Sequence, residues 1–138
     1  MIIEFTVPGE PAGKGRPKFT RSGHTYTPKE TVNYETMVKL AYRQKYPGVK
    51  PVEKDVPLLA TIVAYYKIPA SVSNKKRQAM LEGKIRPTKT PDWDNIGKIV
   101  CDALNGIAYY DDCQIVDSSV KKFYSDTPRV EVEMEAIL

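Results

Sequence analysis

The chain has 138 residues, of which 41% are hydrophobic and 28% charged, and its formal net charge is +4. This length suits a single domain over residues 1–138, and no apolar run approaches the ~20 residues that a membrane-spanning helix requires. One histidine (His24) and two cysteines (Cys101 and Cys113) form neither a Cys/His zinc pattern nor a disulfide framework. We therefore expect a cytoplasmic protein whose chemistry depends on carboxylates, lysine and a metal ion.

The first expected element is a strand over residues 2–7, in which apolar residues alternate with more polar ones. A loop rich in glycine, proline and basic residues follows, from Gly9 to Tyr26. It is either a solvated loop or an arm that contacts phosphates, because lysine, arginine and free backbone N–H groups can approach a nucleic-acid backbone together. It lacks the Walker A pattern. The basic residues of this loop that we assign to DNA binding are Lys14, Arg16 and Lys18.

A helix is expected next, from Thr27 to about Lys45. Thr27-Pro28-Lys29-Glu30 has the pattern of a capping box with proline at the first helical position, and Pro47-Gly48 ends the helix. Residues 56–68 form a nearly continuous apolar run, which is typical of a central strand covered on both faces. A short helix over residues 74–82, capped by Ser73, follows this strand.

A second basic region extends from Lys67 to Lys89, where seven basic residues stand against one acid, Glu82. A solvated helix surface would explain it. However, the region adjoins an acidic segment, and basic flanks around an anionic centre are typical of a site that binds a polyanion and places a metal at one phosphate. The residues of this region that we assign to DNA binding are Lys75, Lys76, Arg77 and Arg86.

The acidic segment covers residues 90–117 and holds six of the eight aspartates of the chain, with Lys98 as its only base. Asp92 and Asp94 follow a proline, so we expect an extended backbone on which the two carboxylates point the same way. Their backbone positions would be about 7 Å apart, so the two short side chains can converge on one ion. Asp94 occupies the expected N-cap of an amphipathic helix that ends at Asn105-Gly106. Lys98 lies one turn into that helix, so it can serve the same site as the carboxylates.

Asp111-Asp112 precedes an expected strand over residues 115–124. Neighbouring residues on an extended chain face opposite ways, so only one of the two should join Asp92 and Asp94, and we choose Asp112. Three carboxylates, with waters completing the coordination shell, suit Mg²⁺ or alternatively Mn²⁺.

Each of these aspartates also has a simpler structural explanation. Asp94 could be only a helix cap, Asp102 only the partner of Lys98, and Asp111-Asp112 only a turn. Taken together, the simple explanations are less satisfactory, because unneutralised carboxylates in proximity raise one another's pKa and destabilise a fold.

The alternating pattern of residues 129–138 indicates a last strand, with apolar residues through Leu138 on one side and glutamates on the other. The expected order of elements is β-α-β-α-α-β-β. This order predicts an α+β fold: a single small domain with a mixed β-sheet of about four strands packed by helices.

Residues 92–117 match the pattern DxDNxxKxxxDALxGxxxxDDxQ(V/I)xD over 26 residues. In this they resemble the RusA-type Holliday junction resolvases, or crossover junction endodeoxyribonucleases, a family common in bacterial and prophage genomes. The N-terminal GEPAGKGRPKF is also similar to the opening segment of that family. The resemblance therefore extends over the whole expected domain.

The resemblance implies a homodimeric, Mg²⁺-dependent endonuclease that resolves four-way DNA junctions by paired nicks, in recombination and repair. It implies metal ligands at Asp92, Asp94 and Asp112, an essential lysine at Lys98 and an auxiliary acid at Asp111. The alternative is a non-catalytic module that binds branched DNA and uses the carboxylates structurally. A DxD-type site for nucleotide-sugar transfer is disfavoured, because the chain has no glycine-rich strand-turn-helix segment.

Overall fold

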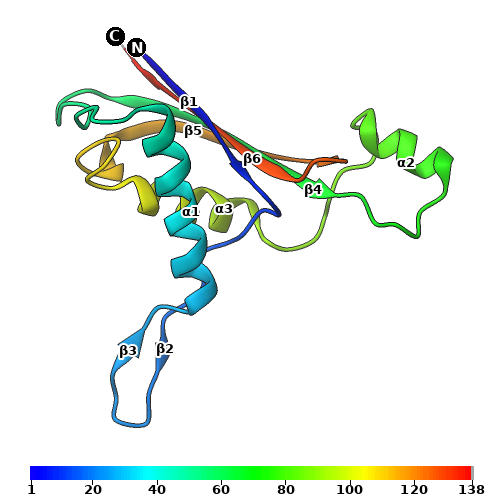
Figure 1. Ribbon diagram of the computed structural model, residues 1–138, viewed down its shortest axis with the longest axis horizontal. Coiled ribbons are helices and arrows are strands. Elements are labelled where there is room, and N and C mark those ends of the chain that lie inside the picture. The colour runs from blue at the N-terminus through cyan, green and yellow to red at the C-terminus, as the bar shows by residue number, and fades with distance from the viewer. Residues whose placement is uncertain (138) are drawn as a thin grey trace.

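The computed structural model of the protein describes residues 1–137 (Figure 1). Residues 1–2 and 135–136 lie side by side at one end of a twisted sheet. The elements in chain order are β1 (Ile2–Pro8), β2 (Lys18–Phe19), β3 (Thr25–Tyr26), α1 (Lys29–Lys45), β4 (Leu58–Lys67), α2 (Asn74–Leu81), α3 (Trp93–Leu104), the short 3-10 helix η1 (Asp112–Gln114), β5 (Ile115–Ser125) and β6 (Arg129–Ala136).

The four long strands form one mixed sheet in the order β1-β6-β4-β5. The β4–β5 pair is parallel, whereas β6 pairs antiparallel with both β1 and β4. This arrangement confirms the expected α+β fold, its order of main elements and its mixed sheet of four strands. The structure adds the small antiparallel pair β2–β3 within the segment expected to be a loop. Leu138, which we expected on the apolar side of the last strand, lies outside the described residues.

The core lies between one face of the sheet and the helices α1 and α3. Along β4, fully buried residues such as Ile62 and Ala64 alternate with half-buried ones such as Val63. The expectation that residues 56–68 are covered on both faces is therefore wrong. α1 and α3 pack on a single face, and the opposite side chains of β4 are shielded only partly by their neighbours in the sheet.

Helix α1 begins later than the sequence predicts. Its first residue is Lys29, and Pro28 is its N-cap without a side-chain hydrogen bond. The Pro28 carbonyl accepts the first helical bond, from the Val32 N–H at 3.2 Å. Thr27 therefore stands before the cap, and the predicted capping box does not form. By contrast, the expected cap of α2 is confirmed, because the Ser73 hydroxyl accepts a bond from the Lys76 N–H at 3.2 Å.

Helix α3 is positioned by its apolar stripe. Ile96, Ile99 and Val100 are completely buried against the sheet and α1, and the helix ends at Leu104 as the Asn-Gly sequence predicts. Its polar side is thereby turned away from the core. No helix within residues 1–137 is long and apolar enough to cross a membrane.

Candidate active site

Asp92 and Asp94 lie at the N-terminal end of α3, but not in the conformation that the sequence predicts. Asp92 is the N-cap, with extended backbone angles (φ −71°, ψ 154°), and its carbonyl accepts the Ile96 N–H at 3.0 Å. Asp94 is already in the first helical turn, so its predicted role as the N-cap is wrong. The helix begins two residues earlier than expected because Asp92, the first residue after Pro91, already caps it. Both carboxylates are exposed at the helix end that favours anions.

A buried tyrosine holds the segment that leads into α3. The Tyr66 hydroxyl donates a hydrogen bond to the Pro91 carbonyl at 2.6 Å, and the Tyr66 side chain is almost completely buried in β4. Burial, with a smaller contribution from the negative charge of Asp92, raises the pKa of Tyr66 to about 12. The phenol is therefore a neutral donor at physiological pH. The sequence did not predict that Tyr66 holds this segment, because Tyr66 belongs to an apolar run that indicates only a strand.

The segment before β2 packs directly on the start of α3. The Lys14 N–H donates to the Asn95 carbonyl at 3.1 Å. A Cβ on Gly13 would lie only 2.9 Å from the Pro91 Cβ and 3.0 Å from the Asn95 Cβ, so this close approach requires glycine. The first basic segment is therefore attached to the acidic one at a defined place.

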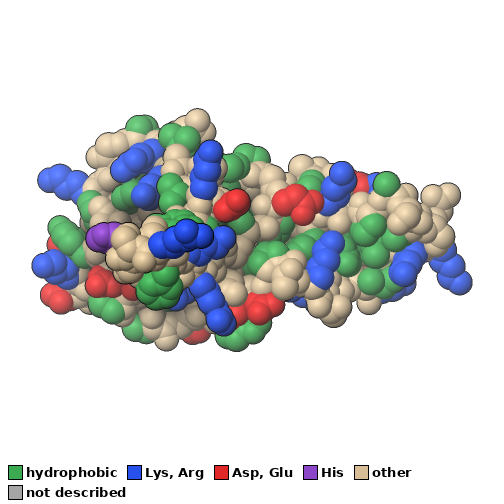
Figure 2. Space-filling model, turned by 90° about the horizontal axis from the view of Figure 1, so that it is seen from below, with side chains coloured by type: hydrophobic (Ala, Val, Ile, Leu, Met, Phe, Trp, Pro, Cys, Tyr) green, Lys and Arg blue, Asp and Glu red, His purple; other side chains and the backbone are tan. Residues whose placement is uncertain are grey.

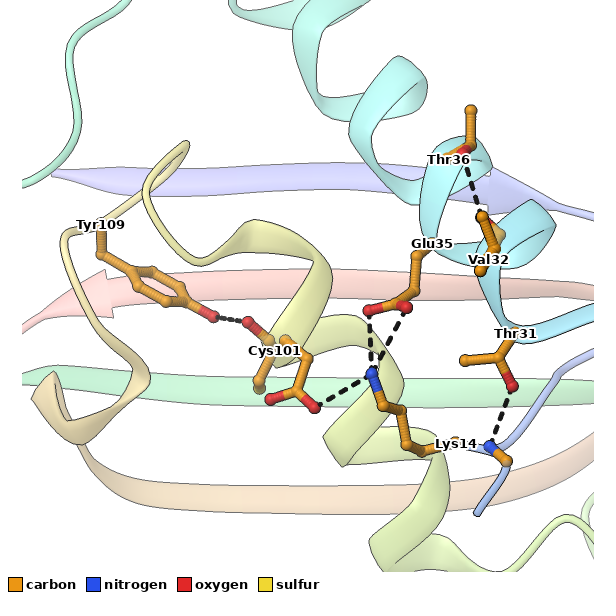
Figure 3. A network of polar contacts seen from close by, with 9 residues as sticks. Lys14, Thr31, Val32, Glu35, Thr36, Cys101 and Tyr109 are labelled. Carbon is orange, nitrogen blue, oxygen red and sulfur yellow. Dashed lines mark hydrogen bonds and ion pairs between the residues drawn. The ribbon is translucent and has the colours of Figure 1, made fainter. Parts of the chain in front are cut away.

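Lys14 links three elements through its ammonium group (Figure 3). Its Nζ lies 3.2 Å from a Glu35 carboxylate oxygen on α1 and 3.4 Å from Asp102 Oδ2 on α3. The side chains of all three residues are largely buried. The sequence assigned Lys14 to DNA, whereas the structure places its charge between two carboxylates of the same chain. Asp102 thus has Lys14 as its partner, and no ion pair between Asp102 and Lys98 occurs within residues 1–137.

Asp112 lies in a crowded group of carboxylates. Burial is the main cause of its raised pKa, and the neighbouring carboxyl groups of Asp111 and Asp102 raise it further. The pKa of Asp111 is lowered instead, first by a hydrogen bond from the Cys113 backbone N–H and then by its contact with Asp112. Negative charge is therefore in excess at this place, and a bound cation would relieve the repulsion.

The loop that carries these acids is held by two amide side chains. Asn105 Oδ1 accepts the Asp112 N–H at 2.8 Å. Gln114 is buried, and its Oε1 accepts the N–H groups of Tyr110 and Asp111 at 2.9 and 3.2 Å. Its Nε2 donates to the carbonyls of Glu53 and Val56 at 2.7 and 3.2 Å. Sequence reasoning read Asn105 only as a helix stop, so its role in positioning Asp112 was missed.

The acids occupy the two ends of α3. Asp94 and Asp102 are separated by eight residues, which is about 12 Å along a helix axis. Lys98 lies between them, exposed on the polar side. In the part of the chain that the structure describes, no group of three or more His, Cys, Asp or Glu residues is arranged to hold a metal ion. The metal site of Asp92, Asp94 and Asp112 therefore stays a prediction.

The basic residues assigned to DNA lie mostly on two projections, the β2–β3 hairpin and the α2 arm (residues 68–90). Figure 1 shows them on either side of the segment that leads into α3. Arg16 and Lys18 on the hairpin side, and Lys75 and Lys76 on α2, are exposed. Two others have partners within the chain: Arg77 pairs with Asp126, and Arg86 donates to the Lys122 carbonyl at 2.6 Å and lies over the Phe123 ring.

Comparison with known proteins identifies the family. The sequence model of the family "Endodeoxyribonuclease RusA" matches residues 8–135. The chain belongs to the RusA endodeoxyribonuclease family.

Two relatives support this assignment. The chain is 42% identical to the protein YqaN of Bacillus subtilis (strain 168) over 143 residues, which cover 98% of this chain and 96% of YqaN.

The second relative is a crossover junction endodeoxyribonuclease, rusA, of Lactococcus phage r1t. It is 30% identical over 125 residues, which cover 90% of this chain and 86% of the phage protein. The RusA match begins at the end of β1 and reaches β6, so it includes the hairpin, the α2 arm and all of α3. Membership of the RusA family places the chain among nucleases that cleave DNA.

Proposed function

We propose that this RusA family protein is a Mg²⁺-dependent endodeoxyribonuclease that resolves Holliday junctions by paired nicks, in DNA recombination and repair. The observation that carries the proposal is the start of α3, where Asp92, Asp94 and Lys98 are exposed between two basic projections. The phage relative, whose name is crossover junction endodeoxyribonuclease, supports the choice of substrate. Four-way junctions supply both the phosphates that the basic residues attract and a scissile phosphate for the acids.

We assign the metal ligands to Asp92, Asp94 and Asp112, with Mn²⁺ as the alternative ion. Carboxylate oxygens are donors that either ion accepts. Burial is the main cause of the raised pKa of Asp112, and the carboxyl groups of Asp111 and Asp102 raise it further. A bound ion would neutralise the charge of these acids. When bound, the ion would polarise the scissile phosphate and lower the pKa of a coordinated water. Lys98 would then stabilise negative charge that develops on the phosphate in the transition state. Asp111 is the auxiliary acid, and its carboxylate fixes the loop by accepting the Cys113 N–H at 3.2 Å.

We further propose that the protein acts as a homodimer. A four-way junction has approximate two-fold symmetry, and two related nicks need two related active sites. One chain provides a single Asp92-Asp94-Lys98 segment. A second copy would supply the other.

A cleavage gel tests the proposed function directly. The substrate is an immobile four-way junction, labelled in turn on each strand and incubated with and without Mg²⁺. We expect nicked duplex products only with the metal, and cuts at symmetry-related positions on two opposite strands. A linear duplex of the same sequence is the control. Junction binding without product, in both Mg²⁺ and Mn²⁺, would instead support the non-catalytic branched-DNA-binding module.

Mg²⁺ is expected to raise the melting temperature of the protein in the absence of DNA. The ion binds the folded carboxylates and not the unfolded chain, so it shifts the equilibrium toward the folded state by mass action, by about 2.7 kcal/mol at a hundred times the dissociation constant. Differential scanning fluorimetry over a Mg²⁺ titration measures the shift.

Two variants control this measurement. Asp112→Asn removes one crowded charge, so we expect a higher melting temperature without metal and a smaller gain with it. Asp117→Asn removes an exposed acid of the same segment that has no assigned role, and it should keep the full gain. A wild-type melting temperature that does not respond to millimolar Mg²⁺ would count against the assigned ligands.

A further inference from the structure

The β2–β3 hairpin carries two large, exposed aromatic side chains that lie outside the hydrophobic core. Phe19 is 75% exposed and Tyr26 is 49% exposed. Both strands of the hairpin are exposed along their length, so neither aromatic contributes to a core. Single exposed apolar residues are common on protein surfaces. Here, however, two of the four paired residues of a projecting ribbon are exposed aromatics. Their exposure does not contribute to the stability of the fold.

The register of the hairpin places the two aromatics on opposite faces. Lys18 pairs with Tyr26, and Phe19 pairs with Thr25. Paired residues of an antiparallel ribbon point to the same face, and successive residues alternate. Phe19 therefore stands on one face and Tyr26 on the other. The ribbon is a thin wedge with an aromatic ring on each side.

The charge of the segment indicates what covers these rings. Residues 15–29 contain four lysines and arginines and neither aspartate nor glutamate. Figure 2 looks toward the projecting hairpin and shows blue basic side chains beside green hydrophobic ones, near the purple histidine, His24. Aromatic rings among basic side chains are typical of surfaces that stack nucleic-acid bases while the charges contact the backbone. This combination favours a nucleic acid over an apolar protein surface.

Hydrogen bonds close the tip of the hairpin and join its base to the candidate active site. At its tip the Thr20 N–H donates to the His24 carbonyl at 2.8 Å, and the His24 N–H donates to the Thr20 hydroxyl at 3.1 Å. At its base the Gly15 N–H donates to the Thr31 hydroxyl at 3.0 Å, and Lys14 is bonded to the start of α3. The base of the hairpin is therefore bonded to the helix that carries Asp94.

We propose that Phe19 and Tyr26 form a base-stacking wedge that enters the branch point of the DNA substrate and stacks on bases exposed there. This inference rests on the proposed function. It explains how the protein would select branched DNA over a continuous duplex. At the crossover of a junction the base stack is interrupted, so a ring on each face of the ribbon can cover an exposed base. A continuous duplex offers no such base without the cost of unstacking it.

Fluorescence of 2-aminopurine tests this wedge. The analogue is placed at the branch point of a four-way junction, and binding is measured without divalent metal, so that no cleavage occurs. We expect wild-type protein to raise the fluorescence, because the analogue leaves its normal stack. Phe19→Ala/Tyr26→Ala should abolish the rise and weaken junction binding roughly tenfold or more, as for the loss of base stacking on aromatic rings. Its affinity for a duplex of the same sequence should change less than about twofold.

Matched variants separate stacking from other effects. Phe19→Trp/Tyr26→Trp keeps an aromatic on each face and should restore both junction affinity and signal. Val32→Ala/Leu40→Ala removes two exposed apolar side chains of α1 and should behave as wild type. Arg16→Ala/Lys18→Ala should weaken junction and duplex binding alike, because phosphate contacts do not depend on branching. Unchanged melting temperatures would verify that each variant is folded.

Several outcomes would overturn the wedge. Equal weakening of junction and duplex binding by Phe19→Ala/Tyr26→Ala would show only general contact with DNA. A changed oligomeric state of that variant in sedimentation would assign the rings to an interface between copies. If wild type cuts junctions but the variant keeps the full 2-aminopurine signal, the wedge fails and the nuclease stands. The opposite separation is also possible. If wild type gives the 2-aminopurine signal and the variant loses it, but wild type does not cleave junctions in Mg²⁺, the wedge is supported and the nuclease is rejected.

Discussion

Asp92→Asn should reduce the rate of junction cleavage in Mg²⁺ at least about 100-fold while junction binding is retained. The substitution preserves the size of the side chain and removes one negative oxygen donor from the exposed end of α3. Binding persists because a lost carboxylate near the phosphates cannot weaken their attraction to the basic projections. Single-turnover cleavage at saturating protein measures the rate, and gel shift without divalent ions measures the affinity.

Asp117→Asn is the matched control for this substitution. Asp117 belongs to the same acidic segment and is exposed on β5, and it is not among the assigned ligands. We expect wild-type cleavage from it. Full activity of Asp92→Asn and of Asp112→Asn would reject the assignment of the metal site. A higher Mg²⁺ requirement in either variant, with partial recovery in Mn²⁺, would support it.

Lys98→Met is the second substitution with a large expected effect, a loss of roughly 10²- to 10³-fold in the cleavage rate constant. Lys98 is exposed one turn beyond Asp94, and within residues 1–137 no carboxylate forms an ion pair with it. The fold therefore leaves this charge available to a phosphate, as the proposed function requires. Because negative charge on the phosphate increases in the transition state, the loss should fall on the rate and much less on junction affinity.

Two further lysine variants distinguish a catalytic role of Lys98 from a simple phosphate contact. Lys98→Arg keeps the charge with a different geometry, so partial activity is expected. Lys76→Met removes an exposed charge of α2, and it should weaken junction binding and leave the saturated rate unchanged. If Lys76→Met and Lys98→Met had the same effect on rate and affinity, Lys98 would be one more phosphate contact rather than a residue of the catalytic site.

The sequence by itself predicted those parts of the protein that depend on near neighbours. Alternation predicted β1 and β6, and the apolar spacing of residues 96–104 predicted the buried side of α3. The spacing of aspartates, asparagine and lysine in residues 92–117 indicated the family, which comparison with known proteins confirmed. These features follow from the period of a strand or a helix and from residue chemistry, both of which can be read within a short window.

Helix starts were less well predicted, because each depends on a choice between adjacent residues. Thr27 and Asp94 both have side chains that favour N-caps. The structure uses Pro28 and Asp92 instead. For Asp92 and Asp94 the difference matters, since the two carboxylates share a helix terminus rather than an extended segment.

The partners of the candidate site residues depend on the tertiary fold. Lys14 turned out to lie between Glu35 and Asp102, and Gln114 reaches the carbonyls of Glu53 and Val56, about sixty residues earlier in the chain. The same is true of Asp112, whose neighbour is Asp102 at the far end of α3 from Asp94. Such contacts depend on how the sheet and helices pack, and this is determined by burial across the whole domain, which no local pattern of residues contains.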